Sequence, residues 1–175
     1  VQAQTDDGAA MKDGLPDDNH LNNANMGTPP DGQAPTMQMY LTGSGPGYTV
    51  LQGNWGDDAA TVYHEYTHGL SNRLVVDADG VSTLTGQQGG AMGEAWSDWY
   101  AMDFLNRGDA APAGMGTAFV PDNSATPGEV DMGAYTDAVP NSIRTQPLDC
   151  PVANPPGTAV ANCPGLGPAD PGGYT

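Results

Sequence analysis

The stretch that decides the fold is His64-Glu65-Tyr66-Thr67-His68. Two histidines four positions apart lie on one face of a helix, about one turn from each other, so both imidazoles can reach a single metal ion. Glu65 lies roughly 100° round the helix from His64. That position makes Glu65 a poor third ligand but places it to take a proton from a metal-activated water. This is the H-E-x-x-H arrangement, a two-histidine zinc motif with an adjacent general base.

The third ligand is expected from Gly93-Glu94-Ala95-Trp96-Ser97-Asp98. A catalytic zinc site uses three protein ligands and leaves one position open. A third histidine, as in H-E-x-x-H-x-x-G-x-x-H, is excluded because Ser71 and Leu74 occupy the glycine and histidine positions. Glu94 is one of three glutamates in the chain, and it opens an apolar run that predicts a buried helix. A carboxylate in such a helix is costly to bury unless it is paired or bound to a metal.

Asp98 follows Glu94 by four positions, on the same helix face, where it can accept the outward N–H of a liganding histidine. Such a carboxylate fixes the imidazole tautomer and raises its basicity. A solvated helical face without metal is the alternative interpretation, and the agreement of two separate halves of one site argues against it. We therefore predict His64, His68 and Glu94 as zinc ligands and Glu65 as the general base.

These residues make the chain resemble the fungalysin family, secreted zinc metalloendopeptidases of the wider thermolysin-like group. The resemblance covers residues 62–74 and 90–98, and extends to the preceding segments 22–25, 28–32 and 37–41. It implies a zincin-like α+β catalytic domain that hydrolyses internal peptide bonds of protein substrates through a zinc-activated water. It also implies a secreted, extracellular enzyme that is made with a propeptide.

The resemblance further implies substrate-binding residues. In thermolysin-like enzymes an Asn-Ala pair on an edge strand aligns the substrate main chain, and Asn23-Ala24 match it best. The alternative is that these asparagines merely tolerate turn dihedral angles. Arg144 follows the third ligand, as an arginine does in the family, and could hold a substrate carbonyl, although an exposed loop arginine fits equally well. The family's transition-state-stabilising His or Tyr has no match near the metal motifs, and we expect it beyond Thr175 in a longer protein.

The chain is expected to form one partial catalytic domain with three regions: 1–53 of strands and loops, 54–108 as the zinc-binding helical core, and 109–175 as Pro/Gly-rich loops. Residues 1–4 could end a strand. Alternation predicts a half-buried strand over 36–41, which forms a hairpin with the segment at 22–25. A further short strand is predicted over 48–51. The zinc helix is predicted over 57–74, capped by Asn54 or Gly56, and the second helix over 91–106.

The composition limits which classes of molecule the chain is expected to bind. The net charge is −17 with only four Lys and Arg residues, which argues against a nucleic acid or an anionic membrane surface. No apolar run approaches the roughly 20 residues that span a bilayer. The high charge would by itself indicate disorder, but Ala, Met, Trp and Tyr supply apolar surface in the motif region. The acids and amide that could gather Ca²⁺ lack the fixed spacing of a calcium loop, so solvated loop residues are the preferred interpretation: Asp6, Asp7, Asp17, Asp18 and Asn19.

Cys150 and Cys163 are the chain's two cysteines, and we predict that they form a disulfide closing a surface loop. Such a bond contributes on the order of 3 kcal/mol and suits a secreted protein; a second metal site is the weaker interpretation. The chain starts at Val1 without a signal-peptide pattern, so we expect an excerpt from a longer precursor. The alternative function is a secreted metal-binding module, or an incomplete fragment, without turnover.

Overall fold

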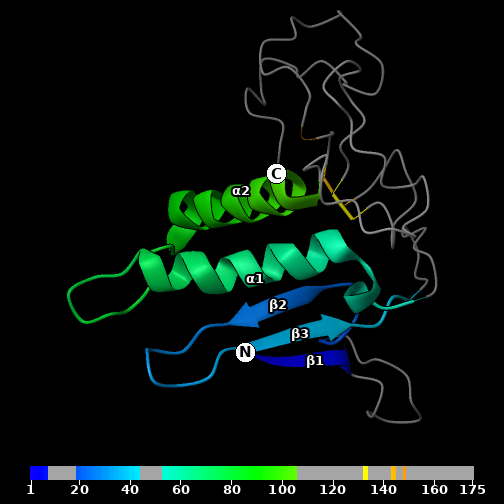
Figure 1. Cartoon of the computed structure of the whole chain (residues 1–175), viewed down its shortest axis with the longest axis horizontal. Coiled ribbons are helices and arrows are strands. Elements are labelled where there is room, and N and C mark those ends of the chain that lie inside the picture. Colours follow the sequence, from blue (N-terminus) through cyan, green and yellow to red (C-terminus); the bar gives the residue numbers. More distant parts are fainter. Residues whose placement is uncertain (8–18, 44–52, 106–131, 134–142, 145–147, 149–175) are drawn as a thin grey trace, which may run out of the picture.

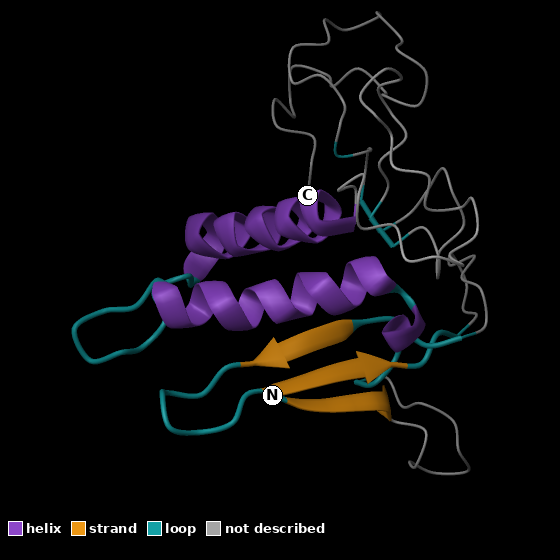
Figure 2. Cartoon of the chain, viewed as in Figure 1, coloured by secondary structure: helices purple, strands orange, loops and turns teal. Residues whose placement is uncertain are grey.

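The computed structural model describes residues 1–7, 19–43, 53–105, 132–133, 143–144 and 148. Its elements, in chain order, are β1 (Gln2–Asp7), β2 (Ala24–Gly27), β3 (Thr36–Tyr40), the 3₁₀ helix η2 (Trp55–Asp57), α1 (Ala59–Leu74) and α2 (Gly86–Leu105). The sheet forms one layer, α1 lies across it, and α2 lies on the opposite side of α1 (Figures 1 and 2). The mixed α+β class predicted from the sequence is confirmed.

The sheet has the strand order β1-β3-β2, with β3 in the centre. β1 is parallel to β3, and β2 is antiparallel to it, with Ala24 opposite Met39 and Gly27 opposite Thr36. The predicted hairpin is therefore present. Met37 and Met39 are 4% and 2% exposed, as the alternation along this strand predicted. Among the described strands β2 is an edge strand, and it is the strand beside α1 (Figure 1).

Two small cores hold α1 between its neighbours. On the sheet side, buried residues of β2, β3 and η2 meet Val62 of α1; on the other side, Ala60 of α1 packs with Ala101 and Met102 of α2 and with Met132. The fully buried members of these clusters are methionine, alanine and tryptophan rather than Leu, Ile or Val. The low aliphatic content of the chain is therefore compatible with a packed core here.

The N-terminus of α1 differs from the prediction. Asp58, rather than Asn54 or Gly56, is the N-cap, and its Oδ1 accepts the backbone N–H groups of Ala60 at 2.9 Å and Thr61 at 3.2 Å. Asn54 instead caps η2, where its side chain accepts from the Gly56 N–H at 2.6 Å. The physical reason is that a separate 3₁₀ turn occupies residues 55–57, so α1 begins two residues later than expected.

The prediction that α2 is a buried helix is wrong. The helix starts at Gly86 rather than Ala91, and Trp99, Tyr100 and Phe104 are each about half exposed. Its buried residues recur at helical spacing along one face, which packs against α1: Gly93, Ser97, Asp98, Ala101 and Met102. An apolar run alone did not distinguish a helix buried on all sides from one packed on a single side.

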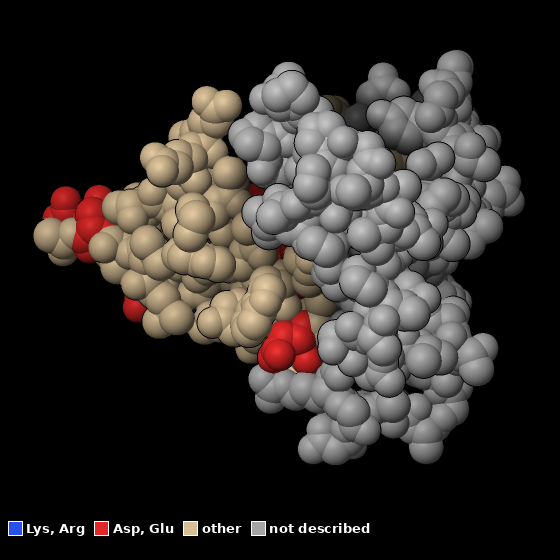
Figure 3. All heavy atoms as spheres, turned by 90° about the horizontal axis from the view of Figure 1, so that it is seen from above, with Lys and Arg blue, Asp and Glu red and all other residues tan. Residues whose placement is uncertain are grey.

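Several predictions fall on residues outside those that the structure describes: the short strand at 48–51, the Cys150–Cys163 disulfide, Asp17 and Asp18 of the calcium hypothesis, and the end of the second helix at Asn106. No helix in the described ranges combines the length and apolarity needed to cross a membrane. On the face shown in Figure 3, acidic side chains gather at the end of the molecule where the loop between α1 and α2 lies.

Candidate metal centre

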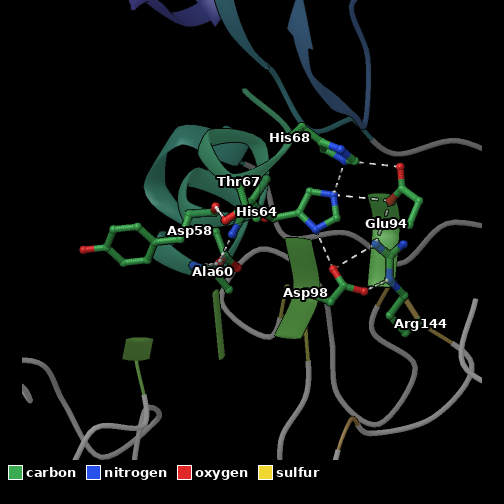
Figure 4. A network of polar contacts seen from close by, with 10 residues as sticks. Asp58, Ala60, His64, Thr67, His68, Glu94, Asp98 and Arg144 are labelled. Carbon is green, nitrogen blue, oxygen red and sulfur yellow. Dashed lines mark hydrogen bonds and ion pairs between the residues drawn. The ribbon is translucent and has the colours of Figure 1, made fainter. Parts of the chain in front are cut away.

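Three side chains converge between α1 and α2. The Nε2 atoms of His64 and His68 are 3.0 Å apart, and each lies 3.3 Å from one carboxylate oxygen of Glu94. One ligand atom from each residue falls within 4.8 Å of the others. Figure 4 shows the two rings and the carboxylate pointing toward one another. The structure thus brings together the three residues that the two motifs predicted.

The spacing of these atoms fits a small ion. Zinc binds histidine nitrogen and carboxylate oxygen at about 2.0–2.2 Å in a tetrahedral arrangement, which separates neighbouring ligand atoms by roughly 3.4 Å. The two N···O separations of 3.3 Å, which go to different oxygens of Glu94, are close to that edge length, and the N···N separation of 3.0 Å is slightly shorter. Two nitrogens and one oxygen are also a donor set that zinc accepts with a fourth position open. His64, His68 and Glu94 could therefore hold one metal ion.

Asp98 contacts His64 through the ring nitrogen that faces away from the other two candidate ligands. Its Oδ1 lies 2.5 Å from Nδ1 of His64, and Asp98 is 1% exposed. When His64 is neutral, a proton held on Nδ1 by this contact leaves the lone pair of Nε2 directed at the other two ligands. Burial alone would lower the pKa of His64, but hydrogen bonds to Asp98 and Glu94 outweigh it and raise the pKa to about 9. Without a metal, the site therefore favours a protonated His64.

The carboxyl groups of Glu94 and Asp98 are both kept ionised by their neighbours. Hydrogen bonds with His64 and His68 keep the pKa of Glu94 far below its usual range. Burial would raise the pKa of Asp98, but hydrogen bonds with His64 and Arg144 lower it. Both groups thus carry negative charge at neutral pH, the form in which they can hold a cation or orient a histidine.

Arg144 reaches the site from far along the sequence. Its Nε donates to Asp98 Oδ2 at 2.6 Å, and its Nη2 donates to Asp98 Oδ1 at 3.0 Å and to Glu94 Oε2 at 3.2 Å. Its side chain is 17% exposed, so the interpretation as an exposed loop arginine is wrong. Figure 4 shows the guanidinium beside both carboxylates. Sequence analysis had not anticipated this contact, because nothing in the local sequence indicates which acids Arg144 meets.

Glu65 lies in the same cleft, apart from the three converging side chains. It is 6% exposed, and burial raises the pKa of its carboxyl group. Its pKa is thereby moved toward the range in which a carboxylate can both accept and return a proton. Glu65 is outside the group of three converging ligand atoms, as its one-residue offset from His64 predicted, and its role as general base stays a prediction.

A cleft of about 500 Å³ is lined by His64, Glu65, His68 and Glu94 and extends to β2 at the sheet edge. Its lining includes the predicted Asn23, Ala24 and Arg144, together with Trp55, Thr61 and Met132, which sequence analysis missed. Thr61 could have been found, since it precedes His64 by three positions and Glu65 by four and so shares their helix face. No sequence signal linked Trp55 or Met132 to the site.

The asparagines before β2 differ in their roles. Asn22 has φ of 52°, and its side chain exchanges hydrogen bonds with the backbone of Gly43. The turn interpretation therefore fits Asn22. Asn23 is paired with Tyr40 through a 3.1 Å bond from the Tyr40 N–H to the Asn23 carbonyl. In an antiparallel pair the next residue points its backbone groups the other way, so the N–H and C=O of Ala24 face the open edge.

Fold and site together define a mixed α+β protein with a candidate metal centre of two histidines and one glutamate. The family model for the fungalysin metallopeptidases (M36) matches residues 2–159. The chain belongs to this family.

Proteins with similar sequences are named as extracellular metalloproteinases. The chain is 35% identical over 142 residues to the extracellular metalloproteinase MEP of Pyricularia oryzae, covering 81% of this chain and 20% of the relative. It is 46% identical over 94 residues to extracellular metalloproteinase 2 of Phaeosphaeria nodorum, covering 53% and 14%. With extracellular metalloproteinase 4 of Trichophyton soudanense the identity is 41% over 129 residues, covering 73% and 28%. The chain thus spans less than a third of the length of these relatives.

Proposed function

We propose that the full-length protein containing this chain is a secreted zinc metalloendopeptidase that cleaves internal bonds of protein substrates. The observation that supports this most directly is the convergence of His64, His68 and Glu94 within 4.8 Å, in the same cleft as the buried Glu65. The names of the extracellular relatives favour secretion, and a propeptide in the precursor is part of the same proposal.

In this mechanism His64, His68 and Glu94 would hold the zinc. When bound, zinc supplies a Lewis acid that makes water nucleophilic near neutral pH. Glu65 accepts the proton of the attacking water and passes a proton to the leaving amine. Asp98 keeps the Nδ1 proton of His64 in place, and Arg144 holds Asp98 and Glu94 in position through three hydrogen bonds.

The substrate main chain would lie along β2. The outward N–H and C=O of Ala24 can pair with an extended peptide, which would become the next strand of the sheet. Asn23 precedes this residue and is exposed at the cleft. Arg144 also lines the cleft, and a substrate carbonyl could share its guanidinium with the two acids. This arrangement positions a peptide by backbone contacts, which suits cleavage inside a protein chain.

The test uses the full-length protein and its Glu65→Gln variant. Wild type should cleave an unfolded protein substrate, lose the activity with a chelator and recover it with zinc. Glu65→Gln should retain one zinc per molecule and lose about 10²–10⁴-fold in kcat, the range that removal of a general base typically costs. Wild type that binds zinc without any chelator-sensitive cleavage would favour the metal-binding module and overturn the proposal.

A further inference from the structure

A second groove adjoins the metal cleft, at the end of the molecule where two loops meet. It has a volume of about 250 Å³ and is lined by the loop after β2, the end of α1 and the loop between α1 and α2. Both loops lie at the same end of the two elements that they follow (Figure 1). Asn72 lines the metal cleft and this second hollow, which we call the distal groove.

Helix α1 leads from the metal ligands to the distal groove. His64, His68 and Asn72 follow one another at intervals of four residues, so they lie on one face of the helix. Asn72 is about 6 Å beyond His68 along the helix axis. Its Oδ1 accepts the hydroxyl of Ser82 at 2.9 Å, which ties the loop between α1 and α2 to this face. The distal groove therefore begins about one helical turn from the candidate ligands.

Strand β2 leads to the same place. It runs beside α1 in the same direction (Figure 1). Ala24 and Met26 line the metal cleft, and the Met26 side chain packs against Gly69 of α1. Beyond the strand, Asp31 pairs with Arg73 near the end of α1. A peptide added to the edge of β2 would advance about 3.3 Å per residue, so substrate residues about two to four positions from the metal would reach the distal groove.

The wall of the distal groove combines apolar surface with carboxylates. Its apolar part includes Pro29, Pro30 and Val81, and its acids are Asp31 and Asp79, both exposed. Acidic side chains gather at this end of the molecule on the face shown in Figure 3. A negative potential here attracts a cationic group and raises its local concentration.

The single basic residue that lines the distal groove is already engaged. The guanidinium of Arg73 donates through Nη1 to Asp31 and through Nη2 to the Gln33 carbonyl, the latter at 2.9 Å. Among the described residues, no basic side chain pairs with the Asp79 carboxylate. The groove therefore carries more negative than positive charge, with Asp79 as the acid that a ligand could pair with.

This combination of surfaces selects one kind of side chain. Lysine and arginine lay an apolar stem along apolar surface and keep the charged head in water. An acidic side chain would meet the carboxylates of Asp31 and Asp79, and a wholly apolar one would remove water from them without compensation. We propose, resting on the proposed endopeptidase function, that the distal groove is a subsite for a lysine or arginine of the substrate, and that Asp79 determines this specificity.

The experiment compares lysine with methionine, which has a stem of similar length without the charge. Peptides that differ only in this exchange, at each position two to four residues from the cleaved bond, are given to the full-length protein. At one position we expect wild type to prefer lysine about threefold in kcat/KM at low salt, the scale of an exposed ion pair. At about 1 M salt, where the Debye length is about 3 Å, the ratio should fall toward one.

Two substitutions at Asp79 test the assignment of the acid. Asp79→Asn should bring the lysine preference toward one, and Asp79→Lys should make the protein prefer glutamate over glutamine at the same position. The backbone N–H of Asp79, rather than its carboxylate, donates to Asp77 Oδ1 at 2.9 Å, so both variants keep the turn. The matched control is Asp6→Asn, an equal change of charge at an exposed residue of β1, on the other edge of the sheet. It should retain the wild-type preference.

Binding of the same peptides to the Glu65→Gln protein, measured by calorimetry, separates this inference from the proposed function. A lysine preference at one position that Asp79→Asn removes supports the subsite, whether or not wild type turns over. Cleavage with equal rates for both peptides, or with a preference for methionine or glutamate, would overturn the subsite and leave the endopeptidase intact. Absence of cleavage with a retained binding preference would overturn the proposed function instead.

Discussion

The two helices of the site are built differently. α1 is packed on both sides, against the sheet and against α2, and its N-terminus is capped by Asp58. α2 packs on α1 with one face and leaves Trp99, Tyr100 and Phe104 about half exposed. The candidate ligands differ in exposure in the same way: the side chain of His64 on α1 is 8% exposed, and that of Glu94 on α2 is 50% exposed.

The difference indicates what fixes each ligand. Close packing on two sides fixes α1, the helix that carries His64 and His68, and Asp98 adds a hydrogen bond to His64. Glu94 has less packing around it, and its position depends on polar contacts with the two histidines and Arg144. One half of the site is thus held by packing and the other by charge.

The largest effect is expected from removing a ligand on either helix. His64→Ala and Glu94→Ala should each reduce zinc affinity by more than the roughly 10–100-fold lost with an outer partner of a ligand. In the metal-free protein, His64→Ala should lower the melting temperature more than Glu94→Ala, because the buried ring leaves a cavity. Zinc content after dialysis and thermal melts with a chelator measure both; stoichiometric zinc in Glu94→Ala would contradict the predicted ligand set.

Arg144→Met tests the half of the site that is held by charge. Asp98, buried beside the guanidinium, would lose a paired charge, which costs about 3 kcal/mol in typical buried pairs. The control is Arg73→Met, because Arg73 at the end of α1 pairs with the exposed Asp31, and such a surface pair contributes at most about 1 kcal/mol. Denaturant unfolding of both variants gives the comparison, and equal losses would show that α2 does not depend on Arg144.

The pH dependence of the melting temperature tests the contact between His64 and Asp98, which joins the two helices, in the metal-free protein. His64 has a pKa raised from 6.5 to about 9 in the folded state, so its contribution to stability is complete below about pH 6.5 and is lost as the pH rises through about 9. Asp98→Asn removes a partner that raises this pKa. The melting temperature of wild type should therefore approach that of Asp98→Asn over this window. A constant difference would show that the His64–Asp98 contact does not control this titration.

The smallest effect is expected from glycine replacement in the two helices. A Cβ at Gly90 of α2 meets no atom within 4 Å, whereas one at Gly69 of α1 meets the end of the Met26 side chain at 2.5 Å. Gly90→Ala should stabilise the protein by up to about 1 kcal/mol through helix propensity. Gly69→Ala should gain less, because Met26 has to move. Equal gains in thermal melts would argue against the tighter packing of α1.

Much of the site could be predicted because its parts are local. Two histidines at helical spacing must share a face, and Asp98 must lie one turn after Glu94, wherever the helix is placed. The hairpin of β2 and β3 followed from alternation and from the turn between them. The predicted cap was wrong because 3₁₀ and α turns compete within a few residues, and small energy differences decide between them.

The sequence by itself determined the ligand types, their spacing and the adjacent acid, since these depend on chain geometry over a single helical turn. Only the tertiary structure decided that Arg144 binds Asp98 and Glu94, that α2 is buried on one face, and that Trp55 and Thr61 line the cleft. These features depend on which surfaces meet across long stretches of chain. Packing and desolvation set that outcome, and no local pattern records it.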